Sequence, residues 1–127
     1  MPIVSIITPT YNRARFLGGA IENVREQTFQ DWELIVVDDG STDETAEVVE
    51  AYRQCDPRIR YLRQANAGLP AARNAGLRAA RGEYAAFLDD DDRFISDKLE
   101  RQLPMLRQRA ELGFVYWPVW VQHEGEA

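Results

Sequence analysis

Four consecutive aspartates, at positions 89–92, are the side chains in this sequence best suited to chemistry. They follow the apolar run 85–88, which is typical of a buried strand. Because adjacent carboxylates repel one another, such a cluster needs a counter-charge, full exposure to water or a metal ion. Carboxylate oxygens are the ligands that Mg²⁺ and Mn²⁺ prefer. The alternative without any ligand is a solvated acidic turn in front of a helix.

A second apolar run, residues 34–37, also ends in acid, at Asp38 and Asp39. Ligands bind open α/β sheets at the carboxyl ends of the strands. Two strands that deliver aspartates to the same edge of a sheet therefore predict a ligand site there.

Composition bounds the class of protein. A chain of 127 residues is long enough for one domain with a real core, and 45% hydrophobic with 28% charged residues describes an ordinary soluble protein. The net charge of −6 argues against nucleic-acid binding but is compatible with a phosphate-bearing ligand if a cation mediates. The sequence carries no signal-peptide pattern and no membrane-spanning run, so we expect a cytoplasmic protein, with the inner face of the membrane as the alternative location.

The hydrophobic pattern predicts alternating strands and helices. Strands are expected at residues 3–8, 33–37, 59–62, 84–88 and 114–121, and helices around 16–24, from 41 to about 56, at 71–81 and from 96 to about 109. This order predicts an α/β fold in three layers, α/β/α, with a mostly parallel sheet and right-handed crossovers.

Local signals place the ends of these elements. Ser41 and Glu44 have the spacing of a capping box for the second helix. Gly82 stands where a left-handed helix C-cap is expected. Pro104 should kink or restart the last helix, and Pro118 suggests an edge strand or a bulge.

Six segments, taken together and in this order, resemble family 2 glycosyltransferases of the GT-A fold. They cover almost the whole chain and lie at residues 4–12, 36–43, 66–68, 72–76, 82–84 and 87–92. The resemblance implies a Rossmann-like fold and an inverting glycosyl transfer from a nucleotide-sugar, most often a UDP-sugar, with Mg²⁺ or Mn²⁺. It also implies a carbohydrate or lipid-linked acceptor.

The resemblance also assigns roles to the acidic cluster. The family's DxD motif falls on Asp89, Asp90 and Asp91. It implies that Asp91 binds the metal and bridges to the diphosphate, that Asp89 is a second metal ligand, and that Asp89 or Asp90 reaches the ribose or the sugar. Arg73 matches the arginine of the family's helix, which implies that it faces the nucleotide. Its alternative role is to neutralise the aspartates around it.

The base-binding residues implied by the resemblance come from the first two strands. Asp38 and Asp39 match the family's base-binding turn, where Asp39 would accept a hydrogen bond from the uracil imide N–H. Pro9, Thr10 and Tyr11 would line the base pocket, with Tyr11 against the face of the ring.

One departure from the family pattern concerns the general base. In the family, that carboxylate and the acceptor-binding segments lie in the second half of the catalytic domain, and no motif nominates Glu111, Glu124 or Glu126 for the role. We therefore interpret residues 1–127 as a single domain, the N-terminal nucleotide-binding portion of a transferase. It would act with a C-terminal half or as a homo-oligomer.

Three other functions can be compared with the sequence. A receiver-type signalling domain needs an acidic pair after its first strand, but here that strand ends in Thr8, Pro9 and Thr10. A nucleotidyltransferase needs a glycine-rich basic loop for the triphosphate; residues 11–15 contain no glycine but two arginines, so it stays a less favoured alternative. A non-catalytic nucleotide-sugar-binding module fits the same residues as the enzyme and stays open as an alternative.

Overall fold

The computed structural model describes residues 1–108, which form four strands and four helices in alternation. The elements are β1 (Val4–Thr10), α1 (Ala14–Arg25), β2 (Trp32–Asp38), α2 (Thr45–Cys55), β3 (Ile59–Arg63), α3 (Leu69–Ala79), β4 (Tyr84–Phe87) and α4 (Lys98–Gln108). All strand pairs are parallel, and the strand order across the sheet is β3-β2-β1-β4. The predicted α/β fold with a parallel sheet is confirmed.

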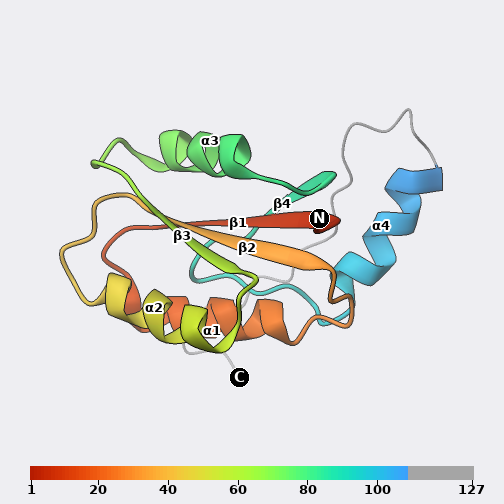
Figure 1. Cartoon of the computed structure of the whole chain (residues 1–127), viewed down its shortest axis with the longest axis horizontal. Helices are drawn as coiled ribbons and strands as arrows, with labels where there is room; N and C mark the ends of the chain where they lie inside the picture. The colour runs from red at the N-terminus through yellow and green to blue at the C-terminus, as the bar shows by residue number, and fades with distance from the viewer. Residues whose placement is uncertain (109–127) are drawn as a thin grey trace, which may run out of the picture.

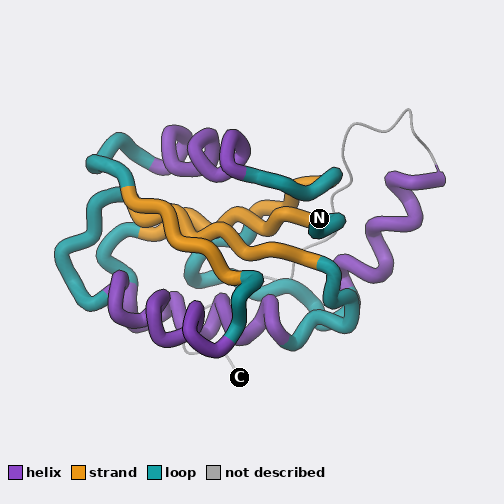
Figure 2. The backbone as a smooth tube through the Cα atoms, in the orientation of Figure 1, coloured by secondary structure: helices purple, strands orange, loops and turns teal. Residues whose placement is uncertain are grey.

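Helices cover both faces of the sheet, as Figure 1 shows. Helices α1 and α2 lie on one face and α3 lies on the other, while the strands run between them (Figure 2). Successive strand residues point to opposite faces, so Ile6 packs toward α1 and its neighbour Ile7 packs toward α3. Because both faces are covered, β1 and β2 are buried along their whole length.

Strand β1 continues two residues beyond the predicted end at Thr8, through Pro9 to Thr10. A proline within a central strand normally removes a ladder hydrogen bond. Here the pairing of β1 with β4 stops at Ile7 and Phe87, so β4 offers no partner opposite Pro9. The extra residues bring Thr10 to the edge of the sheet where the acidic cluster lies.

Two predicted helix caps are wrong. Helix α2 begins at Thr45, and the oxygen that accepts a hydrogen bond from the Thr45 amide belongs to Asp43, at 3.1 Å. Ser41 instead accepts a hydrogen bond from the backbone N–H of Asn12. At the other site, α3 ends at Ala79 and Gly82 has no left-handed conformation. A Cβ at Gly82 would lie 2.7 Å from the Ser5 amide nitrogen, so this glycine permits close backbone approach.

Helix α4 continues through Pro104 to Gln108, without the restart that the proline suggested. Its buried residues Leu99 and Leu103 join the core on the α1 side of the sheet. The predicted strand 114–121, with Pro118, lies outside the described residues, as do Glu111, Glu124 and Glu126.

Candidate functional site

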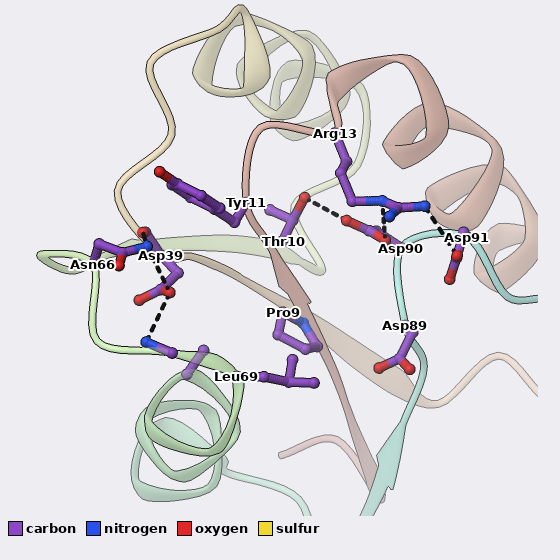
Figure 3. Close-up of a pocket in the computed structure, with 12 residues that line it drawn as sticks. Pro9, Thr10, Tyr11, Arg13, Asp39, Asn66, Leu69, Asp89, Asp90 and Asp91 are labelled. Carbon is purple, nitrogen blue, oxygen red and sulfur yellow. Dashed lines mark hydrogen bonds and ion pairs between the residues drawn. The ribbon is translucent and has the colours of Figure 1, made fainter.

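A cavity of about 540 Å³ opens at the carboxyl ends of β1, β2 and β4, beside the first turn of α3. Here the chain order reverses, because β2 and β3 lie on one side of β1 and β4 lies on the other. The residues that line the cavity are Pro9, Thr10, Tyr11, Arg13, Asp39, Asn66, Gly68, Leu69, Ala72, Asp89, Asp90 and Asp91. The acidic ends of β2 and β4 thus line the same cavity from opposite sides, as Figure 3 shows.

Asp39 fixes the loop that leads into α3. One carboxylate oxygen accepts hydrogen bonds from the Gln64 side chain and the Ala67 amide, both at 2.8 Å. The other accepts from the Asn66 side chain at 3.1 Å and the Gly68 amide at 3.0 Å. Burial alone would raise the pKa of Asp39, but these hydrogen bonds outweigh it and hold the pKa below its ordinary value. Asp39 is therefore an anion at neutral pH.

Gly68 makes this arrangement sterically feasible. Its φ of 97° lies in the region that side chains rarely adopt, and it immediately precedes α3. Pro70 follows in the first turn of the helix, where its fixed φ is tolerated. The turn points the Gly68 amide at Asp39 and sets Leu69 and Ala72 against the cavity.

Asp38 does not line the cavity, although it was predicted to bind the nucleotide with Asp39. Its side chain is fully buried and accepts hydrogen bonds from the Ser41 amide, the Tyr61 hydroxyl and Arg63. Burial and the hydrogen bond to Asp38 raise the pKa of Tyr61. The position of Asp38 ties the end of β2 to β3 and indicates a structural role.

In the acidic cluster, Asp90 is the most buried carboxylate, with 6% of its surface exposed. The hydroxyl of Thr10 donates to it at 2.9 Å, and the Nε of Arg13 lies 3.1 Å from its other oxygen. Burial raises the pKa of Asp90, and the charges of Asp91 and Asp89 add to this effect against the influence of Thr10 and Arg13.

Arginines supply the counter-charge that the cluster requires. Arg13 donates from Nη2 to Asp91 at 2.9 Å, and Arg73 donates from Nη2 to Asp89 at 3.2 Å. Arg73 does not line the cavity, so the structure shows its neutralising contact, and its approach to a nucleotide stays a prediction. Arg13 was not among the predicted site residues. Adjacent carboxylates such as Asp90 and Asp91 require a positive counter-charge, and this requirement is the signal that could have pointed to Arg13.

A second feature that sequence reasoning missed is Asn12, which joins the loops after β1 and β2. Asn12 has a positive φ of 52°, a conformation that asparagine tolerates better than most residues. The Asn12 side-chain oxygen accepts a hydrogen bond from the Thr42 amide at 2.7 Å, and the backbone N–H of Asn12 donates one to the Ser41 hydroxyl at 2.9 Å. These bonds set the half-exposed Tyr11 at the cavity and Arg13 at the acids.

The carboxylates fit a divalent cation that is shared with a ligand. Within residues 1–108, no three histidine, cysteine or carboxylate side chains converge as an all-protein metal site requires. Mg²⁺ is commonly held by one or two carboxylates together with substrate phosphates. Asp89 and Asp91 offer two hard oxygen donors on the wall of a cavity that has room for such a substrate.

The sequence matches the model of one protein family, described as glycosyl transferase family 2, over residues 5–126. The chain belongs to this family. Both the predicted family and the predicted GT-A type of α/β fold are thereby confirmed, the latter by its structural neighbours.

Curated relatives of this family 2 chain are longer proteins. TuaG of Bacillus subtilis, whose name assigns it to teichuronic acid biosynthesis, is 43% identical over 111 residues, which are 86% of this chain and 44% of TuaG. The chain therefore spans less than half the length of this relative.

Two solved structures that are similar to this chain contain nucleotide-sugar ligands. Residues 1–349 of Staphylococcus aureus TarS in complex with UDP-GlcNAc align with a TM-score of 0.78 and 31% identity, covering 85% of this chain and 32% of that one. The mannosyltransferase PcManGT of Pyrobaculum calidifontis, in complex with GDP-Man and Mn²⁺, aligns with a TM-score of 0.76 and 31% identity, covering 83% and 32%.

None of the helices in residues 1–108 of this family 2 chain combines the length and hydropathy needed to cross a membrane.

Proposed function

We propose that this chain serves an inverting glycosyl transfer, in which it binds a UDP-sugar as the donor, together with Mg²⁺ or Mn²⁺, and the sugar is transferred to an acceptor. The acceptor would be a carbohydrate or lipid-linked hydroxyl group. The observation that carries the proposal is a single cavity with Asp39 at the end of β2 and Asp89 and Asp91 at the end of β4. Family relatives that bind UDP-GlcNAc, or GDP-Man with Mn²⁺, support it.

The end of β4 would bind the diphosphate. Asp91 and Asp89 would hold the cation, which supplies a Lewis acid for the charge that develops on the diphosphate leaving group. Asp90 accepts a hydrogen bond from the Thr10 hydroxyl and so keeps the loop 89–92 against β1. Asp90 therefore positions its two neighbours, and its side chain is the least accessible of the three to the donor.

The end of β2 would bind the base. Tyr11 is 47% exposed beside the cavity and offers an aromatic face for stacking. Asp39 already accepts four hydrogen bonds, two of them from backbone amides that the start of α3 fixes. A uracil imide N–H would therefore reach Asp39 by displacing the side chain of Gln64 or Asn66 rather than a backbone amide.

Titration of the purified chain with UDP, in Mn²⁺ and in a chelator, tests the cation-dependent site. We expect at least ~10-fold tighter binding with Mn²⁺, because the cation bridges carboxylates and phosphates. Asp91→Asn should remove most of this difference. Asp97→Asn, which changes a carboxylate next to α4, is the matched control and should leave it intact. Equal affinities with and without Mn²⁺ would refute the cation role, and equal affinities for UDP and CDP would refute the base assignment.

A second candidate function is nucleotide-sugar binding without transfer. It is favoured by the cavity lining within residues 1–108, because its four carboxylates, Asp39, Asp89, Asp90 and Asp91, all have a role in donor binding, whereas transfer also requires a general base. Incubating the chain with labelled UDP-sugar and a panel of acceptors distinguishes the two functions. Multiple turnover supports the enzyme, and tight binding without turnover supports the binding module.

A further inference from the structure

Arg13 lies across two carboxylates of the acidic cluster. It stands immediately before α1, and its guanidinium contacts Asp90 through Nε at 3.1 Å and Asp91 through Nη2 at 2.9 Å. Figure 3 shows the side chain reaching from the loop after β1 toward the loop after β4. Arg13 therefore occupies one of the two Asp91 oxygens that a cation could bind.

The contact of Arg13 with the acids is incomplete. Its Nε is buried but makes no hydrogen bond of good geometry, although Asp90 lies close to it. The side chain as a whole is 41% exposed and lines the cavity. Asp90 also has a partner of its own, the Thr10 hydroxyl, so the loop 89–92 keeps its anchor on β1 when the guanidinium leaves.

A guanidinium and a divalent cation on the same Asp91 carboxylate are like charges a few ångströms apart, and such charges repel strongly in a partly buried site. The planar fork of arginine suits phosphate oxygens as well as carboxylates. A guanidinium displaced from Asp91 stays on the cavity wall, within the space that the proposed function assigns to the donor.

We propose that Arg13 competes with the divalent cation for Asp91 and, once displaced, binds the donor's phosphate groups. This inference rests on the proposed function. Arg13 then links cation binding to donor binding. The cation releases the guanidinium from Asp91, and the guanidinium then donates hydrogen bonds to the diphosphate. Arg73 also pairs with a proposed cation ligand, Asp89, but it does not line the cavity and so is not placed to bind the donor's phosphate groups.

The exchange predicts effects of opposite sign when Arg13 is removed. Without nucleotide, Arg13→Ala should bind Mn²⁺ about 3- to 10-fold more tightly than the wild type, because the competing charge is gone. With saturating Mn²⁺, the same variant should bind UDP about 10-fold more weakly, because a charge-assisted hydrogen bond to phosphate is lost. Arg13→Lys keeps the charge without the fork and should lie between the wild type and Arg13→Ala in both measurements.

The test measures free Mn²⁺ by electron paramagnetic resonance at low ionic strength, and UDP binding by calorimetry, on the full 127-residue chain. Arg101→Ala is the matched control, because Arg101 pairs with Asp97 at α4 and does not line the cavity. It should match the wild type in both measurements. Thermal melting in chelator shows whether each variant is folded.

Each alternative outcome identifies what fails. Unchanged or weaker Mn²⁺ binding by folded Arg13→Ala would overturn the competition, and unchanged UDP binding would overturn the transfer to phosphate. If Mn²⁺ binds the wild type and Asp91→Asn equally, the cation is not at Asp91, and the proposed function fails first. If neither the wild type nor Arg13→Ala binds Mn²⁺ without nucleotide, the competition is overturned, and the proposed function is then decided by the UDP titration with and without Mn²⁺.

Discussion

At the scale of single residues, the aspartates of this site differ in how their negative charge is balanced. Asp39 accepts four hydrogen bonds, and they lower its pKa despite burial. Asp90 is also buried, but the charges of its neighbours Asp91 and Asp89 add to burial, and its pKa is raised. Ionised Asp39 therefore stabilises the fold, whereas ionised Asp90 destabilises it while keeping the loop 89–92 in place.

This difference predicts a pH-dependent effect of Asp90→Asn. The pKa of Asp90 in the folded state lies above the unfolded value of ~3.9. The ionised carboxylate therefore does not lower the stability of the fold below pH ~3.9, and lowers it fully once the pH exceeds the folded pKa. In chelator, the variant should melt about 2–5 °C higher than the wild type at pH 7 and show no gain at pH 3.5. Thermal denaturation at the two pH values measures this.

Asp43→Asn is the control of opposite sign. The hydrogen bond from Thr45 outweighs burial and, with the amides of Ala14 and Thr45, lowers the pKa of Asp43. Its stabilisation is present above the unfolded pKa and is lost as the pH falls through the folded one. Asp43→Asn should therefore lower the melting temperature at pH 7. A gain for Asp43→Asn, or an equal gain for Asp90→Asn at both pH values, would contradict the charge assignment.

At the scale of elements, the cavity depends on how closely α3 packs on β1. A Cβ added to Gly76 would lie 2.4 Å from Cγ2 of Ile7, which is 0% exposed in the core. Ala72 of the same helix packs against this core cluster and also lines the cavity. Because Gly76 has no side chain, α3 can pack closely on β1. This close packing places Gly68 and the first turn of α3 beside Asp39, at the end of the sheet.

Gly76→Ala should therefore lower the free energy of unfolding by about 1–3 kcal/mol, since the methyl group forces α3 away from Ile7. Gly18→Ala in α1 is the matched substitution. A Cβ at Gly18 would make an ordinary contact, 3.5 Å from the Tyr52 hydroxyl. Gly18→Ala should therefore raise the free energy of unfolding by about 0.5–1 kcal/mol, because alanine favours a helix more than glycine does. Urea denaturation of both variants measures the two effects. Equal changes would show that α3 is not packed as described.

How much of the site could be predicted from the sequence depends on whether the signal is local. Short apolar runs predict the strands that end at Asp38 and at the acidic cluster. The parallel order follows from the alternation of strands with helices. The difference between Asp38 and Asp39 is not local. Adjacent strand residues face opposite ways, and only the partners on β3 and the 64–68 loop decide which one is enclosed.

Arg13 and Gly82 were missed or misread for the same reason. Arg13 lies 78 positions before Asp91, so no spacing rule connects the two. Gly82 has the sequence position of a helix cap, but the backbone of Ser5, 77 positions earlier, explains its missing side chain. Contacts between distant segments therefore had to come from the fold.

At the scale of the whole molecule, we infer that the ends of β2 and β4 form one site, which binds the nucleobase at one end and the cation at the other. The three-layer arrangement in Figure 1 puts both strand ends at one edge of the sheet. An acidic chain of net charge −6 can bind a diphosphate in this site only if positive charge offsets the carboxylates, from a cation and from Arg13.

Amide resonances of the isotope-labelled chain, recorded with UDP and Mg²⁺ and again with UDP and a trace of paramagnetic Mn²⁺, test this claim most directly. UDP should shift the amides of Asn66, Ala67 and Gly68, which surround Asp39. Mn²⁺ should then broaden the amides of residues 89–91 most strongly, and leave those of α2 sharp. The claim is contradicted if Mn²⁺ broadens residues elsewhere more than 89–91, or if UDP shifts none of the amides around Asp39.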